Sequence, residues 1–383
     1  MISTRTSILA LVALGATALT GCTAAQDSAS STGSSTGAGA ADAASGTTIR
    51  AVATTTQICD YLTHIAAPST GDSASGIALV KTDSSGETST LGATGKDAST
   101  TLELTCLLAP NASAHEHEMT PQQMQALSQA DYLFLNGVDL EHFLDNAVEA
   151  SGFHGTRIVT AGEDGSGAKT SDVAHHVEVK PWPFPGEDGE APEFEYDPHV
   201  WTSPRNAKIQ VDNIVDALAE SDPAVREVGK AYDTQLDDLD AWVKASLESV
   251  PEKDRVLFTS HDAFGYFAAD YGVKFIGSAL TDFNNQQDAT SAHIDEAAQA
   301  VRDSGAKAIF AENSTNPKSI EAIARAAGVK AITAEDALYG DSLGVPGSAG
   351  ETYLGSIIHN VTTLVEAWGG TAAPLPESLE ATR

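Results

Sequence analysis

The stretch Asp197-Pro198-His199-Val200-Trp201-Thr202-Ser203-Pro204 lies near the middle of a 383-residue chain, between two similar sequence patterns. Proline fixes its own backbone and restricts the residue before it, so His199 is expected on a stiff, extended segment. Strand and helix patterns alternate before this stretch and again after it. Such alternation predicts parallel sheets, and the chain is long enough to bury two cores. The sequence therefore predicts an α/β protein with two Rossmann-like lobes, each a parallel sheet flanked by helices.

The first lobe is expected over residues 48–204. Strands are predicted where apolar and β-branched residues alternate or cluster, and helices where apolar residues recur every three or four positions. The predicted strands are 48–55, 102–109, 132–135 and 157–160, and the predicted helices are 57–66, 120–130 and 141–150. Residues 68–101 are rich in Ser, Thr and Gly and are expected to form an exposed insertion, with a hairpin as one possible form and one weak strand pattern at 77–81. Residues 162–196 are expected to form a long acidic loop.

Helices are expected over residues 205–250, between the lobes. Asp222-Pro223 is a helix-start signal, and from 223 to 250 apolar residues recur in steps of three and four. This segment spans roughly 40 Å at the helical rise, which fits one rigid helix bridging both lobes as well as an ordinary long surface helix. The second lobe is expected over 251–369, followed by a tail over 370–383. Its predicted strands are 255–260, 273–276, 307–311 and 330–334, and its predicted helices are 264–271, 292–304, 317–327 and 352–368.

The N-terminus predicts export from the cytoplasm. Arg5 is followed by an apolar run at 8–14, which is too short for a mature membrane-spanning helix and typical of a signal peptide over residues 1–21. The run leads to Leu19-Thr20-Gly21-Cys22, which resembles the bacterial lipobox, in which the cysteine becomes the lipidated first residue. Residues 22–47 are rich in Ser, Gly, Ala and Thr and are expected to form a flexible tether. The protein is therefore expected to be extracytoplasmic and lipid-anchored to the bacterial cell membrane through Cys22.

Charge and cysteine content narrow the classes of partner and site. Lys and Arg number 21 against 53 Asp and Glu, which gives a formal charge of −32. A field of this sign repels nucleic acid and disfavours charge-driven binding to anionic membranes. With Cys22 assigned to lipid, Cys59 and Cys106 remain as an even pair in an oxidising compartment. They fit either a disulfide or two buried free thiols, and they supply only half of a tetrahedral structural metal site.

Four side chains with metal-ligating chemistry follow predicted strands, where ligands of open parallel sheets bind. They are His115 after strand 102–109, His199 after strand 157–160, His261 after strand 255–260 and Asp341 after strand 330–334. Neutral imidazole and carboxylate suit zinc, and three histidines with one aspartate close a tetrahedron. A closed set leaves no open coordination position for catalysis. The pattern therefore indicates a protein that carries a metal.

Six motifs resemble the metal-binding lipoproteins of bacterial zinc/manganese ABC importers, the cluster A-I or family 9 periplasmic solute-binding proteins. They are TTTQICDYL at 54–62, HEHEMTPQQMQALSQADYLFLNGVDLE at 115–141, DPHVWTSP at 197–204, SHDAFGYFAADYG at 260–272, ENSTNPK at 312–318 and DSLG at 341–344. The resemblance runs from about Thr48 to Trp368. It implies two α/β lobes joined by one long helix, with one metal in the cleft between them, held by the four side chains named above.

The same resemblance implies a function. It implies extracytoplasmic, high-affinity capture of a divalent transition metal and its delivery to an ABC-type permease in the membrane, without enzymatic activity. The expected partners are the metal ion and the permease, with no nucleic acid, and the expected state is a monomer. Family members resembling zinc carriers have His at the position of His261, whereas members resembling manganese carriers often have Glu. Three imidazoles also suit zinc, so Zn²⁺ is the expected cargo and Mn²⁺ the alternative.

The chain departs from the family pattern near the first ligand. Ser113-Ala114 stands where the family has Asp-Pro, and His117 stands where it has Tyr. His117 therefore remains an alternative or auxiliary ligand, although the downstream match at Glu118, Thr120 and Pro121 favours His115.

Other groups near the predicted centre have two interpretations each. Glu312 and Asp262 are either carboxylates that orient a ligand imidazole or ordinary polar residues at strand ends. His175-His176 in the acidic loop either collects metal loosely or belongs to a solvated loop.

Two other classes of function fit part of the pattern. A surface adhesin or interaction protein would use the metal only to stabilise its fold. A secreted zinc hydrolase would need an open coordination position and a general base, and His115-Glu116-His117-Glu118 does not have the HExxH spacing.

Overall fold

Parallel strands separated by helices build the N-terminal half around a six-stranded sheet with the order β3-β2-β4-β1-β5-β6. The computed structural model describes residues 46–68, 76–94, 97–182, 194–280 and 291–380. The strands are β1 (Thr47–Ala53), β2 (Ile77–Thr82), β3 (Thr88–Gly92), β4 (Thr100–Cys106), β5 (Tyr132–Leu135) and β6 (Thr156–Val159). All neighbouring strands are parallel except β3, which is antiparallel to β2. The last residue of β1, Ala53, pairs with both Cys106 and Phe134, so the central strands end together at one edge.

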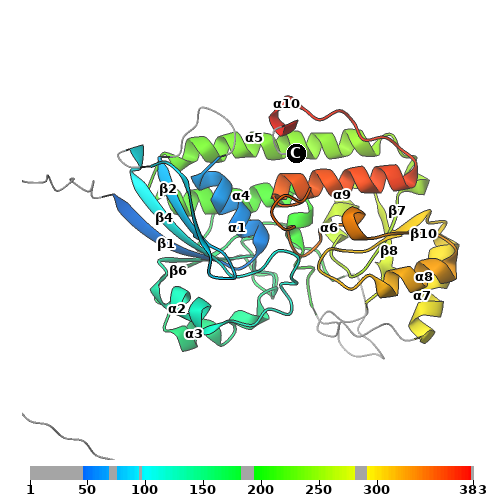
Figure 1. The fold of residues 1–383 in the computed structure, drawn as a ribbon, viewed down its shortest axis with the longest axis horizontal. Coiled ribbons are helices and arrows are strands. Elements are labelled where there is room, and N and C mark those ends of the chain that lie inside the picture. Colours follow the sequence, from blue (N-terminus) through cyan, green and yellow to red (C-terminus); the bar gives the residue numbers. More distant parts are fainter. Residues whose placement is uncertain (1–45, 69–75, 95–96, 183–193, 281–290, 381–383) are drawn as a thin grey trace, which may run out of the picture. The chain divides into compact units, whose positions relative to one another are not determined.

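Helices cover both faces of this sheet (Figure 1). They are α1 (Thr56–Ala66), α2 (Pro121–Gln129) and α3 (Ala147–Ser151), with a 3-10 turn at His142–Leu144. Ala51 and Ala53 belong to a core shared with α1, whereas Val52 belongs to a separate core under α2. This alternation along one strand is the period of two expected of a strand covered on both faces. Thr120 is the N-cap of α2 and forms a capping box with Gln123.

The structure corrects the expectation of an exposed insertion at residues 68–101. Strand β2 is an inner strand that pairs in parallel with β4, and it buries Ile77 and Leu79 in the main core. Strand β3 forms a hairpin with β2, as one form of the insertion predicted, and is exposed along its whole length. The weak strand pattern at 77–81 is therefore a real strand, because its two apolar residues fall on the face that packs against the core.

The predicted helix 141–150 is also wrong in its first half. Glu141 is buried, and its carboxylate accepts hydrogen bonds from the backbone N–H of Asn136 at 2.6 Å and from Thr54 Oγ1 at 2.8 Å. The Glu141 side chain binds the backbone just after β5. The predicted helix is replaced by a short 3-10 turn followed by α3. Helix formation here is overridden by a buried carboxylate whose partners lie just after β1 and β5.

A disulfide joins Cys59 in α1 to Cys106 at the end of β4, with a Cα–Cα distance of 5.7 Å. Of the two alternatives left open by the sequence, the structure has the disulfide.

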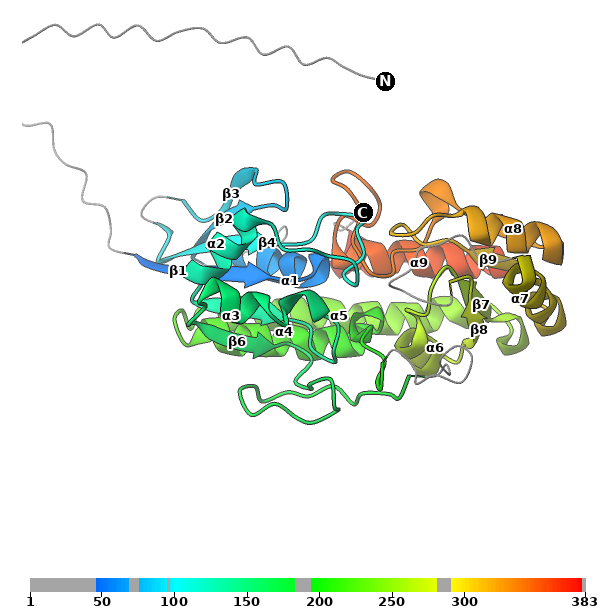
Figure 2. The same cartoon turned by 90° about the horizontal axis from the view of Figure 1, so that it is seen from below.

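Long helices connect the two halves of the described chain. Helix α4 (Pro204–Ala219) follows a 3-10 turn at Val200–Thr202 and packs on α5 (Val225–Leu247), which is the central part of the helix predicted at 223–250. Helix α5 contacts α1 of the N-terminal half and both α6 (Gly265–Tyr271) and α9 (Tyr353–Trp368) of the C-terminal half. Figures 1 and 2 show α5 and α9 running side by side. The short α10 (Glu377–Glu380) of the tail also packs on α5.

The C-terminal half contains two parallel strand pairs. Strand β7 (Val256–Thr259) pairs with β8 (Lys274–Ser278), and β9 (Ala308–Phe310) pairs with β10 (Lys330–Ile332). Strands β7 and β9 are in contact, so the pairs lie next to each other. Helices α7 (Ser291–Ser304) and α8 (Lys318–Ala327) cover them, and 3-10 turns lie at Glu252–Asp254 and Ala334–Asp336. Both halves thus have the predicted α/β architecture, and the exact lobe boundaries stay a prediction.

The predictions for the N-terminus fall outside the described residues. The signal peptide, Cys22 and nearly all of the tether lie within residues 1–45. Within the part of the chain that the structure covers, no helix has both the length and the apolar character needed to cross a bilayer.

Candidate metal centre

The structure brings His115, His199, His261 and Asp341 together, with one donor atom of each within 4.8 Å of the others. His115 Nε2 lies 3.1 Å from His199 Nε2, and His261 Nε2 lies 2.7 Å from Asp341 Oδ1. Asp341 Oδ1 is 3.6 Å from His199 Nε2 and 3.9 Å from His115 Nε2. All three imidazoles therefore present the same nitrogen to one carboxylate oxygen.

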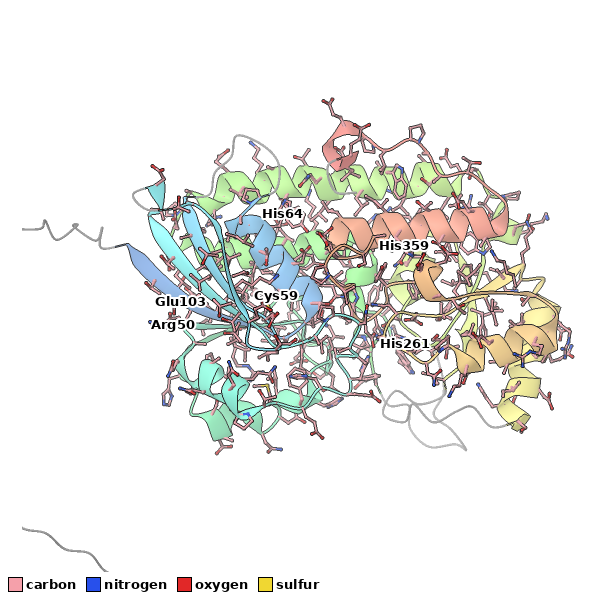
Figure 3. The ribbon with its side chains drawn as sticks, viewed as in Figure 1. Arg50, Cys59, His64, Glu103, His261 and His359 are labelled. Atoms are coloured by element: carbon pink, nitrogen blue, oxygen red, sulfur yellow. A yellow bond between two sulfur atoms is a disulfide. The ribbon has the colours of Figure 1, made fainter. Side chains whose placement is uncertain are left out.

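Each of these residues lies in a loop that leaves the carboxyl end of a strand or leads into a helix. His115 follows β4, His261 follows β7 directly, and Asp341 lies in the loop between the 3-10 turn at 334–336 and α9. His199 immediately precedes the 3-10 turn at Val200–Thr202. Figure 3 shows His261 at the junction of the N-terminal and C-terminal halves. Residues far apart in the sequence thus meet at the strand ends, where an α/β fold places its ligands.

Two carboxylates outside the group of four fix the orientation of two imidazoles. Asp197 Oδ1 lies 2.8 Å from His199 Nδ1 and also accepts a hydrogen bond from the His199 backbone N–H at 2.9 Å. Glu312 Oε2 lies 2.8 Å from His261 Nδ1, and its Oε1 accepts from the His261 backbone N–H at 2.9 Å. Holding Nδ1 on a carboxylate leaves Nε2 to face the centre, which is how metal-ligating histidines are usually supported. Glu312 therefore contacts His261 through both of its carboxylate oxygens, and its role in orienting the imidazole stays a prediction.

The Asp341 loop is held by residues that the sequence alone did not identify. Ser113 Oγ donates to Asp341 Oδ2 at 2.7 Å, and Gln57 Nε2 donates to the Asp341 backbone oxygen at 3.1 Å. Gly340 precedes the aspartate, and a side chain at that position would overlap the Glu312 carboxylate. The sequence signal for this support was positional: Gln57 lies within the motif at 54–62, and Ser113 lies two residues before the motif at 115–141. For Asp197, a carboxylate two residues before His199 was visible in the sequence itself.

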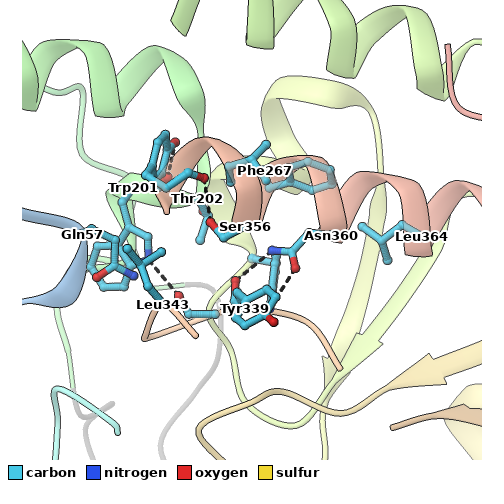
Figure 4. Close-up of a pocket in the computed structure, with 13 residues that line it drawn as sticks. Gln57, Trp201, Thr202, Phe267, Tyr339, Leu343, Ser356, Asn360 and Leu364 are labelled. Carbon is cyan, nitrogen blue, oxygen red and sulfur yellow. Dashed lines mark hydrogen bonds between the residues drawn. The ribbon is translucent and has the colours of Figure 1, made fainter. Parts of the chain in front are cut away.

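A small cavity of about 10 Å³ lies beside the centre, between α1, α6 and α9 (Figure 4). Its lining includes Trp201, whose Nε1 donates to the Gly340 backbone oxygen at 2.9 Å. Such a volume accommodates roughly one water molecule, so the interior behind the Asp341 loop is almost fully packed. The loop is therefore supported from behind by side chains of both halves.

Burial and neighbouring charges shift the pKa values of the centre's side chains in opposite directions. Burial lowers the pKa of His115 to about 3. Burial acts in the same direction on His261, but the carboxylates of Asp341 and Glu312 outweigh it and raise its pKa well above the ordinary value. Burial alone would raise the pKa of Asp341, yet the neighbouring imidazoles, His261 first, hold it below its ordinary value. A dense set of donors with an ionised carboxylate at its middle is suited to a cation.

The remaining candidate residues lie outside the group of four. The His117 ring packs edge-on against Phe143, with ring centroids 4.8 Å apart. Asp262 is next to His261 in sequence, and burial raises its pKa to about 7. His175 Nε2 lies 3.4 Å from Asp216, and His176 Nδ1 lies 2.7 Å from the Gly162 backbone oxygen. The structure therefore does not bring His117 or the two histidines of the acidic loop to the centre.

Comparisons with known proteins agree with this architecture. The sequence model of the family described as zinc-uptake complex component A periplasmic matches residues 96–367. The manganese-binding lipoprotein MntA of Halalkalibacterium halodurans is 31% identical over 259 residues, which are 66% of this chain and 76% of that protein. The zinc-binding protein TroA of Treponema pallidum is 30% identical over 267 residues, which are 68% of this chain and 80% of that protein.

A solved structure shares the fold. The periplasmic zinc-binding protein TroA from Treponema pallidum superimposes with a TM-score of 0.64 at 24% identity, covering 84% of this chain and 99% of that one. The sequence matches confirm the family resemblance, and the superposition confirms the two-lobe α/β fold inferred from the sequence. The chain belongs to the family of zinc-uptake complex component A periplasmic proteins, which are extracytoplasmic metal-binding components of ABC importers and not enzymes.

Proposed function

We propose that this protein binds a single divalent transition metal ion through His115, His199, His261 and Asp341 and delivers it to a membrane permease. The observation that supports the proposal is the convergence of their donor atoms within 4.8 Å in the interior of the fold. Each of their side chains is at most 2% exposed. Three nitrogens and one oxygen complete a tetrahedral shell and leave no open position for a reacting water. A closed shell suits capture and delivery of the ion and disfavours the hydrolase alternative.

We propose zinc as the cargo. The names of similar proteins do not decide between metals, because MntA of Halalkalibacterium halodurans is named for manganese, TroA of Treponema pallidum for zinc and YfeA of Yersinia pestis for iron. The donor set does favour one metal, since imidazole nitrogen suits zinc whereas manganese prefers oxygen donors. Manganese remains the second candidate.

Attachment to the membrane and lobe organisation complete the proposal. A lipid on Cys22 would hold the protein at the membrane, and residues 22–47 would give it reach through a flexible tether. The N-terminal lobe would cover 48–204, the connecting helices 205–250 and the C-terminal lobe 251–369, with the metal between the lobes. The protein is proposed to act as a monomer.

A calorimetric titration of the metal-stripped protein with zinc and with manganese tests this function. The expected result is one saturable zinc site that is lost or badly weakened in His199→Ala and retained in His154→Ala, because His154 is an exposed histidine away from the centre. The metal-free protein should stay folded and reload. Unfolding on chelation would support a metal-stabilised adhesin, tighter manganese binding would overturn the choice of metal, and absence of any saturable site would refute the function.

A further inference from the structure

Two aromatic residues, Phe194 and Trp182, cover the imidazoles of the metal centre. The Phe194 ring centroid lies 5.6 Å from that of His115, and the Trp182 centroid lies 6.2 Å from that of His199. The two aromatic rings also contact each other edge to face, with centroids 5.5 Å apart. Because the ligand side chains are buried, an ion can reach them only if a covering group moves.

Phe194 stands between a buried and an exposed imidazole. The Phe194 ring also contacts that of His142, at a centroid distance of 5.9 Å, and the His142 side chain is 48% exposed. Phe194 itself is 1% exposed. Among the described residues, the Phe194 ring therefore contacts both a buried imidazole of the centre and a partly exposed imidazole.

The backbone that carries these rings is fixed on both sides. Residues 180–182 and 195–197 pair as two short antiparallel segments: Trp182 N–H donates to the Glu195 oxygen at 3.0 Å and Asp197 N–H to the Lys180 oxygen at 2.9 Å. The Tyr266 hydroxyl of α6 accepts from the Lys180 N–H at 3.1 Å and donates to the Asp197 oxygen at 2.9 Å. Rotation of the two aromatic side chains would leave these backbone hydrogen bonds intact.

A third aromatic neighbour, Trp201, does not fit this role. Its ring lies 5.4 Å from that of His199, but its Nε1 is hydrogen-bonded to Gly340 and it is 3% exposed, in the interior behind the centre. Trp182, by contrast, is only half-buried.

We propose that Phe194, supported by Trp182, is the barrier that the metal passes on its way in and out, and that it sets the rate of exchange without contributing to affinity. A phenyl ring offers no lone pair to zinc, so it cannot act as a ligand. A barrier slows binding and release by the same factor and leaves their ratio unchanged. A residue that only supported the His115 ring would change the release rate and the affinity together. The inference rests on the proposed function, because it assumes that the four donors hold the ion.

The test compares zinc exchange in Phe194→Ala, Phe194→Leu and wild type. Release is followed by mixing the zinc-loaded protein with excess chelator, and binding by competition with a zinc-sensitive dye. Both rates should rise about tenfold in Phe194→Ala, with an unchanged Kd, and by less in Phe194→Leu, which keeps part of the cover. Trp182→Ala should raise both rates more modestly. Phe153→Ala is the matched control, since Phe153 is a half-buried phenylalanine of the same half that packs in a separate core.

Three results would overturn the inference. Unchanged rates in both Phe194→Ala and Trp182→Ala would show that the ion passes elsewhere. Faster release with unchanged binding, and a correspondingly weaker Kd, would show that Phe194 only supports His115. If Phe194→Ala does not fold, Phe194→Leu decides by the same criteria. A wild-type protein with no zinc site would instead refute the proposed function, and this inference with it.

Discussion

The disulfide between Cys59 and Cys106 should be a main contributor to the stability of the N-terminal half. It links α1 to the end of β4 across a sequence separation of 47 residues. Closing a loop of that length lowers the entropy of the unfolded chain by an amount worth about 4 kcal/mol at 25 °C in the chain-entropy treatment. Both cysteines are buried, so Cys59→Ala/Cys106→Ala keeps small apolar side chains in place and adds little cavity cost.

Denaturant unfolding measures this contribution directly. The double-alanine variant and the reduced wild-type protein should both lose about 4 kcal/mol of unfolding free energy relative to the oxidised wild type. Reduced wild type is the matched control, because it opens the same loop without changing any side chain. A loss below about 1 kcal/mol in both would refute the reasoning, since the unfolded chain would then gain almost no freedom from the open loop.

Three further predictions concern other parts of the fold. Burial lowers the pKa of His64 from its ordinary 6.5 to about 4. Protonation of His64 therefore favours the unfolded chain, and the unfolding free energy falls as the pH drops from 6.5 to 4. Unfolding titrations at pH 7 and pH 4 should show that His64→Gln removes about 3 kcal/mol of that loss. Gly229→Leu should destabilise the protein by about 2 kcal/mol in urea unfolding, because a Cβ at this position of α5 meets Val215 of α4 at 2.5 Å, whereas Lys230→Leu on the exposed side should be nearly neutral. Zinc at about a thousand times its Kd should raise the unfolding free energy by about 4 kcal/mol in wild type and by much less in Asp341→Asn; equal stabilisation of both would contradict the assigned ligand.

The regular elements could be predicted because their patterns are local. The apolar stripe of residues 225–247 and the capping box at Thr120 each specify a helix within one segment. Strand β2 was underestimated because it buries only Ile77 and Leu79, and its place in the sheet depends on pairing with β4. The helix expected from Glu141 fails for the same reason, since the partners of that carboxylate lie outside the segment.

In the candidate centre, too, local features could be predicted and long-range contacts could not. The four donor residues could be inferred, because each follows a strand and lies in a motif shared with a known family. Their supports could not, because Ser113 and Gln57 reach Asp341 only after the two halves of the chain have packed together. Phe194 carried no signal either, since an aromatic residue in an acidic loop gives no indication of what it will cover.

The continuity of α5 limits how far the two halves of the protein can move when metal binds. The helix runs unbroken past α1, α6 and α9, and it contains no proline and one glycine, Gly229, close to its start. Rotating one half against the other would require a kink in α5 and the loss of some of its backbone hydrogen bonds. A large conformational change on metal binding is therefore costly. A receptor that must tell a loaded molecule from an empty one therefore has to read a difference confined to the loops around the metal. Discrimination between the two states becomes a matter of local surface chemistry, and mutations in those loops should affect recognition even where they leave metal affinity intact.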